Sequence, residues 1–172
     1  PQDPSDEFDG STLNLCRWSQ IVRHEPDGYT VADGKLTLPA AHGDFFQNAP
    51  NNNPNLLLQP APSGPWTMST RLTFDPDENY EQAGLLVYGD DANYVKADVV
   101  HSSNRAIEFL RETDNTAAGF DGTVSIADKP TTVELQVVSD GTTLRAYYRF
   151  DGDAGWTAFG EPAPLAVILS DA

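Results

Sequence analysis

Residues 80–100, YEQAGLLVYGDDANYVKADVV, contain two segments in which apolar and polar positions alternate on either side of a turn. A strand with this alternation has one face on a core and one face free. The pattern therefore predicts an antiparallel hairpin whose free face carries Gln82, Lys96 and Asp98. The apolar positions are Ala83, Leu85, Val87, Val95, Ala97 and Val99.

The rest of the chain continues this pattern. Helical periodicity is nearly absent, and 13 glycines and 13 prolines recur between short runs rich in Val, Leu, Thr, Tyr and Phe. This is typical of an antiparallel all-β sandwich, and we predict a single domain over residues 1–172. The predicted strands are Trp18–Arg23, Tyr29–Ala32, Lys35–Leu38, Leu56–Gln59, Trp66–Phe74, Gln82–Tyr88, Tyr94–Val100, Ala106–Glu112, Thr131–Ser139, Thr142–Phe150 and Trp156–Phe159.

Residues that favour turns and loops lie between these predicted strands. Asp140-Gly141 is the strongest hairpin signal, because both residue types suit the backbone of a tight turn. The prolines and asparagines of Asn48–Asn55 cannot continue a ladder, so they predict a long loop between Phe46 and Leu56.

Alternation in the later strands extends the polar face. The polar positions of five strands are Gln82, Lys96, Asp98, Glu108, Gln136, Arg145, Tyr147 and Arg149. We predict that they share one face. Planar amide, guanidinium and phenol groups pair with hydroxyls in a fixed geometry, which favours a saccharide ligand. A face that is merely solvated is the alternative.

The composition of the chain limits the classes of molecule that we expect it to bind. Ten Lys and Arg stand against 26 Asp and Glu, a formal net charge of -16. Such a field repels phosphate backbones and anionic headgroups, so we expect neither nucleic acid nor membrane as a partner. The carboxylates make calcium binding plausible. Cys16 is the only cysteine, which excludes an internal disulfide, and we expect it to be small and mostly buried.

Several segments resemble a known family in the family's order. They are DEFDG (6–10), LNLCRWS (13–19), NLLLQPAP (55–62), YEQAGLLVYGDDANYVKADV (80–99) and IEFLRE (107–112). They are similar to the concanavalin A-like jelly-roll domain at the C-terminus of family 43 β-xylosidases and arabinofuranosidases, and to related actinobacterial accessory domains. The resemblance implies two curved sheets, with a concave face that holds a saccharide.

The resemblance also implies site residues. In the xylosidases this domain lends an aromatic loop to the mouth of the catalytic site, and here that loop looks like residues 41–47. Phe45 and Phe46 are therefore expected at the ligand-facing rim or in the core beside it, with Tyr80 as another stacking residue. Calcium sites in such jelly rolls draw on the chain start, here Asp6, Glu7 and Asp9. A late Asp is missing, because the family continues with two further strands; either the chain is cut short or its last strand is supplied differently.

Catalysis by the domain itself is disfavoured. A glycosidase needs two carboxylates flanking the scissile bond. The E-x-D-x-x-E string of jelly-roll glucanases is absent. Glu108 and Glu112 share a face but lie about 13 Å apart along a strand, which is too far for either catalytic geometry. Glu108 with Asp98, across strands, is a closer pair.

Three functions remain open. The first is a non-catalytic carbohydrate-binding module of a secreted glycan-degrading protein, binding xylan, arabinan or another glycan on the concave sheet. The second is a structural domain that docks on its own catalytic domain and shapes the active site. The third is a jelly-roll glycosidase or lyase. None of them requires a cofactor, and structural Ca²⁺ is an option. Trp156, near a predicted hairpin end, suits either a rim contact or plain packing.

Overall fold

The computed structural model describes residues 4–118 and 122–169. Contacts divide the chain into two compact units. The N-terminal unit comprises Pro1–Phe45 and Ala49–Ala61, and the C-terminal unit comprises Phe46–Asn48 and Pro62–Ala172. A single domain over residues 1–172 stays a prediction.

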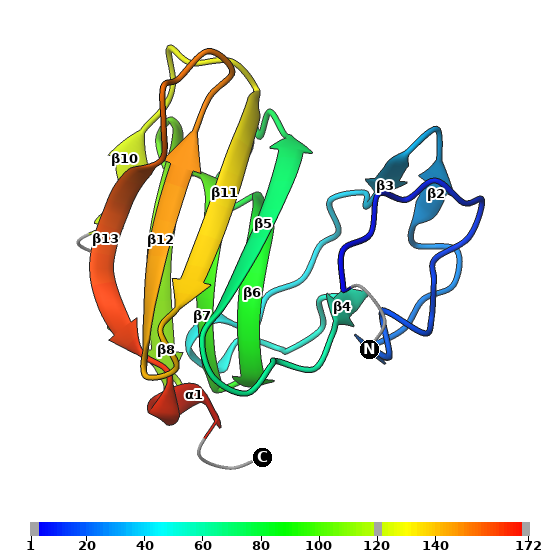
Figure 1. Ribbon diagram of the computed structural model, residues 1–172, viewed down its shortest axis with the longest axis horizontal. Coiled ribbons are helices and arrows are strands. Elements are labelled where there is room, and N and C mark those ends of the chain that lie inside the picture. The colour runs from blue at the N-terminus through cyan, green and yellow to red at the C-terminus, as the bar shows by residue number, and fades with distance from the viewer. Residues whose placement is uncertain (1–3, 119–121, 170–172) are drawn as a thin grey trace. The chain divides into compact units, whose positions relative to one another are not determined.

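The C-terminal unit is an antiparallel sandwich of two sheets, as predicted (Figure 1). One sheet has the order β10-β8-β7-β6, with β9 paired to β8. The other has the order β13-β12-β11-β5. The first sheet is formed by β6 (Gln82–Asp90), β7 (Asn93–His101), β8 (Arg105–Thr113), β9 (Thr116–Ala118) and β10 (Val124–Ser125). The second is formed by β5 (Trp66–Thr73), β11 (Thr132–Ser139), β12 (Thr143–Arg149) and β13 (Thr157–Pro164).

The alternating apolar positions of both sheets meet in one core. Val95, Ala97 and Val99 of β7 belong to the same buried cluster as Val133 and Leu135 of β11. Burying one such aliphatic side chain stabilises the fold by about 1.5–3 kcal/mol. Because the apolar faces point inward, the polar faces of the two sheets point outward, in opposite directions.

The predicted Asp140-Gly141 hairpin is confirmed. It joins β11 to β12, which pair in antiparallel register from Glu134↔Arg149 to Ser139↔Leu144. The Asp140 carboxylate accepts the Thr142 hydroxyl (2.8 Å) and the N–H groups of Thr142 (2.9 Å) and Thr143 (2.8 Å). These bonds lower the pKa of Asp140, the Thr142 hydroxyl contributing most. Gly141 follows with a φ of 94°, which glycine adopts without strain.

The N-terminal unit holds two small antiparallel sheets. β1 (Gln20–Val22) pairs with β4 (Leu56–Leu58), and β2 (Thr30–Ala32) pairs with β3 (Lys35–Thr37). The sequence between Phe46 and Leu56 contains no strand, as its prolines and asparagines predicted. Its only regular element is the short 3-10 turn η1 (Phe46–Asn48), which belongs to the C-terminal unit.

The prediction for Cys16 was wrong. Its side chain is exposed, because the Asn14 carbonyl accepts the N–H groups of both Arg17 and Trp18 and so closes a turn with Cys16 at its tip. The predicted strand starting at Trp18 accordingly begins only at Gln20.

The last strand of the chain also differs from its predicted bounds. β13 continues to Pro164, beyond the predicted end at Phe159, because Thr143 of β12 pairs with Pro164 across a bulge. The helical turn α1 (Ala166–Leu169) follows it. Within residues 4–118 and 122–169, no helix has the length and apolar character needed to cross a membrane.

Candidate functional site

Four of the predicted ligand-binding residues form one cluster on the outer face of β6, β7 and β8. The Lys96 ammonium donates hydrogen bonds to Gln82 Oε1, to Asp98 Oδ2 (3.0 Å) and to Glu108 Oε1 (2.5 Å). The strand register explains the grouping, since Asp98 stands directly opposite Glu108. We call Gln82, Lys96, Asp98 and Glu108 the Lys96 cluster.

Two members of the Lys96 cluster are buried, whereas Glu108 is half-buried and Gln82 is exposed. Lys96 is 9% exposed and Asp98 3% exposed. Burial alone lowers the pKa of Lys96, but the two carboxylates outweigh it and the pKa is raised. Burial raises the pKa of Asp98 to about 6, against the lowering effect of Lys96. The Lys96 ammonium, which was expected to meet sugar hydroxyls, is therefore bonded to three side chains of its own sheet.

A glycine makes room for the cluster. Gly84 of β6 stands opposite Asp98. A Cβ at this position would lie 2.3 Å from the Ala97 carbonyl oxygen and 2.5 Å from the Asp98 Cα. Any other residue at position 84 would thus collide with the backbone of β7, so glycine is required by this close approach.

A second buried acid lies farther along the same face. Glu112 of β8 pairs in register with Tyr94 of β7 and accepts its hydroxyl at 3.0 Å. Both carboxylate oxygens of Glu112 also accept the Gln47 N–H, at 3.0 and 3.1 Å. The carboxylate therefore holds η1 against this sheet. Alternation placed Glu112 on this face, but nothing in the sequence indicated its partners.

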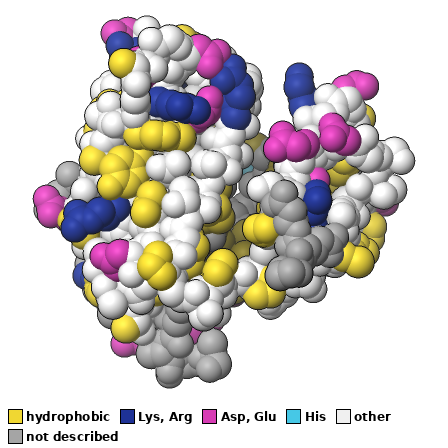
Figure 2. Space-filling view, viewed as in Figure 1, with side chains coloured by type: hydrophobic (Ala, Val, Ile, Leu, Met, Phe, Trp, Pro, Cys, Tyr) yellow, Lys and Arg dark blue, Asp and Glu magenta, His cyan; other side chains and the backbone are white. Residues whose placement is uncertain are grey.

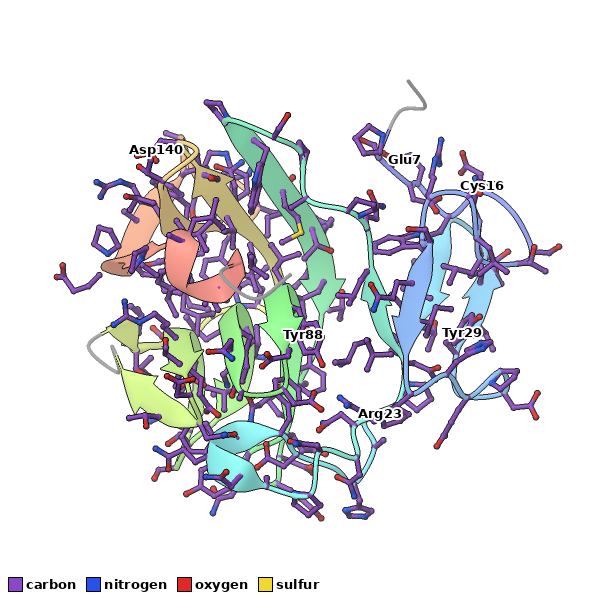
Figure 3. All side chains as sticks on the ribbon, turned by 90° about the horizontal axis from the view of Figure 1, so that it is seen from below. Glu7, Cys16, Arg23, Tyr29, Tyr88 and Asp140 are labelled. Atoms are coloured by element: carbon purple, nitrogen blue, oxygen red, sulfur yellow. The ribbon has the colours of Figure 1, made fainter. Side chains whose placement is uncertain are left out.

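The remaining predicted sheet residues lie elsewhere. Gln136, Arg145, Tyr147 and Arg149 belong to β11 and β12, in the other sheet. The prediction of one polar face across five strands is therefore wrong, because the core separates the two outer faces. Figure 3 shows the same division, with Tyr88 on β6 of one sheet and Asp140 at the β11–β12 turn of the other.

An ion-pair row crosses the outer face of this second sheet. Arg149 pairs with Glu134 Oε2 at 2.6 Å, and its guanidinium lies 4.5 Å from the centre of the Trp156 ring. Arg71 contacts Glu134 at 3.4 Å and binds Asp151 with two bonds of 2.6 Å. The bonds from Arg71 lower the pKa of Asp151. Sequence reasoning did not identify Arg71, Glu134 or Asp151.

The space-filling view shows this sheet from outside. Lys or Arg side chains and hydrophobic side chains gather side by side over β11, β12 and β13 (Figure 2). Gln136 and Tyr147 are register partners there and are both half-buried, whereas Arg145 is exposed. This face carries planar groups that remain partly open to solvent.

The predicted rim residues differ in exposure. Phe45 and Phe46 are both half-buried. The stem of their loop is closed by two hydrogen bonds, from the Asp44 N–H to Asn52 Oδ1 (3.1 Å) and from the Asn52 N–H to the Asp44 carbonyl (3.4 Å). Tyr80 is 74% exposed, with a left-handed φ of 70° just before β6.

The calcium site at Asp6, Glu7 and Asp9 stays a prediction, and Asp6 already has structural partners. Asp6 Oδ2 accepts the Trp18 indole N–H (2.9 Å), while Oδ1 accepts the Phe8 N–H (3.0 Å) and pairs with Arg17 (3.4 Å). Both oxygens thus have structural partners. In the described part of the chain, no three His, Cys, Asp or Glu residues are gathered to hold an ion. Figure 3 marks Glu7 beside this segment of the N-terminal unit.

The family model of the β-xylosidase C-terminal concanavalin A-like domain matches residues 5–172. The chain belongs to this family. The predicted resemblance and the predicted concanavalin A-like sandwich are thereby confirmed. No curated protein matches the chain.

Solved structures agree on the fold of this β-xylosidase C-terminal domain. A mutant of the GH43 protein BlXynB from Bacillus licheniformis is 22% identical, with a TM-score of 0.81, over 92% of this chain and 30% of that one. The xylan β-1,4-xylosidase from Bacillus halodurans is 17% identical, with a TM-score of 0.77, over 99% of this chain and 33% of that one. The chain therefore spans about a third of the length of these proteins.

Proposed function

We propose that this β-xylosidase C-terminal domain is a structural accessory domain, which docks on the catalytic domain of its own chain and shapes the sugar site with the Phe45–Phe46 loop. The observation that carries the proposal is the closed Lys96 cluster. A module that binds glycans by itself needs free donors and acceptors. Here the Lys96 ammonium is bonded to Gln82, Asp98 and Glu108.

The neighbours in structure support a docking role. Each has a chain about three times the length of this domain; one is a GH43 protein and the other is a xylan β-1,4-xylosidase. By analogy, the partner of this domain is a glycoside hydrolase catalytic domain and the substrate is a xylan-type saccharide. Contacts between domains of one chain are usually polar, and the domain has a polar sheet face of ion pairs around Arg71 and Arg149. Secretion of the parent protein stays a prediction.

The test uses the parent enzyme. Phe46→Ala is expected to raise KM for xylo-oligosaccharides about tenfold with little change in kcat, since the ring would contribute ground-state binding. Leu38→Ala removes an exposed apolar side chain instead and is expected to leave both constants within about twofold. Unchanged KM in both Phe45→Ala and Phe46→Ala enzymes would contradict the proposed loop role.

A second candidate function rests on a different face. Trp156, under the Arg149 guanidinium, and the half-buried Tyr147 present rings on the β13-β12-β11-β5 sheet, where a saccharide could stack. If this second function is correct, the accessory domain binds glycans on the β13-β12-β11-β5 sheet rather than at the Lys96 cluster.

Titration calorimetry with xylo-, arabino- and galacto-oligosaccharides tests this candidate. Saturable heat is expected, with affinity lowered about tenfold by Trp156→Ala or Tyr147→Ala. Thr67→Ala, an exposed position of β5, is the matched control and should bind normally. Absence of heat with every glycan would remove this function and leave the docking role.

A further inference from the structure

Glu112 is the most completely buried acid among the residues described. It is 0% exposed, in β8, yet no Lys, Arg or His of the described ranges forms a salt bridge with it. Its partners are the Tyr94 hydroxyl and the Gln47 N–H. A carboxylate removed from water is retained in a fold only where hydrogen bonds replace its hydration.

One of the two donors that replace its hydration is a backbone group. Both oxygens of Glu112 lie within hydrogen-bond distance of the Gln47 nitrogen, at 3.0 and 3.1 Å. The two residues are 65 positions apart in sequence. Glu112 therefore fixes the backbone of η1 at a single point.

The backbone held at this point is strained. Gln47 has φ 48° and ψ 56°, and Asn48 follows with φ 66°. Two successive left-handed residues that are not glycine persist only where surrounding contacts enforce them. Phe46 is the residue immediately before Gln47, so the direction in which the loop presents its aromatic residues depends on this conformation.

We propose that Glu112 is the positioning residue of the Phe45–Phe46 loop: by holding the Gln47 N–H, it keeps Gln47 and Asn48 in their left-handed conformation and so sets the place of Phe46 at the sugar site. This inference rests on the proposed accessory function. Glu112 itself touches no substrate. Its effect on the enzyme passes through the backbone of one turn.

The experiment compares parent-enzyme variants by kinetics and by hydrogen exchange at the Gln47 amide. Glu112→Ala is expected to raise KM about tenfold with kcat nearly unchanged, and to speed exchange at Gln47 at least about tenfold. A purely structural loss would lower the amount of active enzyme without raising KM. Tyr94→Phe is the matched control, because it removes the other hydrogen bond of Glu112 and leaves the Gln47 bond; KM is expected to stay within about twofold.

The conservative variant keeps the test decisive. Glu112→Gln retains one acceptor oxygen, so KM is expected to rise only about threefold, with Gln47 exchange between that of wild type and Glu112→Ala. If Glu112→Ala does not fold, Glu112→Gln decides alone. Wild-type KM and wild-type exchange in that variant would overturn the proposal.

Phe46→Ala separates the two hypotheses. If Phe46→Ala raises KM and Glu112→Ala does not, the accessory function stands and the role of Glu112 is wrong. If Phe45→Ala and Phe46→Ala both leave KM unchanged, the proposed loop role in the accessory function fails, and faster Gln47 exchange in Glu112→Ala would show only an anchored turn without effect on substrate binding.

Discussion

Lys96→Met is expected to lower the free energy of unfolding of the 172-residue chain by about 3–5 kcal/mol at pH 7.5. The ammonium is the one cation in contact with Asp98 Oδ2 (3.0 Å) and Glu108 Oε1 (2.5 Å) among the described residues. Methionine keeps the volume and removes the charge, so two carboxylates that stand opposite each other would stay in a nearly dry site. Urea unfolding followed by Trp fluorescence measures the change.

Two comparisons isolate the cause. Lys129→Met removes an exposed lysine of the same unit and is expected to change stability by less than about 0.5 kcal/mol. Adding Asp98→Asn and Glu108→Gln to Lys96→Met removes the unpaired charges and should recover most of the loss. A loss below about 1 kcal/mol for Lys96→Met alone would show that the cluster is far better solvated than its burial indicates.

The chain is expected to be more stable at pH 5 than at pH 7.5, by about 1.4 kcal/mol from Asp98 alone. Burial raises the pKa of Asp98 from its ordinary 3.8 to about 6. The folded state therefore binds a proton that the unfolded state releases, so this contribution is complete below about pH 3.8 and is lost as the pH rises through about 6. Denaturant unfolding at a series of pH values measures the slope.

Asp98→Asn supplies the control for that slope, because its amide cannot titrate. The difference in stability between pH 5 and pH 7.5 should shrink by the same amount in this variant. Asp140 and Asp151 do not affect this comparison of stability. Their pKa values are lowered, so the stability that they contribute is lost only at more acidic pH. Identical slopes in the two proteins would mean that Asp98 is ionised throughout this range.

The two predictions are linked through one site. If Asp98 takes up a proton near pH 6, the cluster carries less negative charge at pH 5, and the loss caused by Lys96→Met should be smaller there than at pH 7.5. The closed cluster thus acts as a structural element of the sandwich. This agrees with an accessory domain whose effect on catalysis passes through its loops.

The local sequence pattern determined much of the fold of this domain. Alternation identified which side chains of β7 and β11 point into the core, and Asp140-Gly141 fixed a hairpin, because both signals depend only on residues close in sequence. Short segments, those around residues 55–62 and 80–99 among them, carried the resemblance to the family, which the match over residues 5–172 confirmed. The grouping of Gln82, Lys96, Asp98 and Glu108 also followed from alternation along neighbouring strands.

Only the tertiary structure decided the rest. Whether β8 and β11 share a sheet depends on the path of the chain between them. Alternation within a strand carries no information on that path. The structure places β8 and β11 in different sheets, so Tyr147 and Lys96 lie on opposite faces of the sandwich. The same limit hid the bond from Gln47 to Glu112, which joins residues 65 positions apart. Sequence pattern reports which face of a strand a residue occupies, whereas partners across the fold are set by strand order and register.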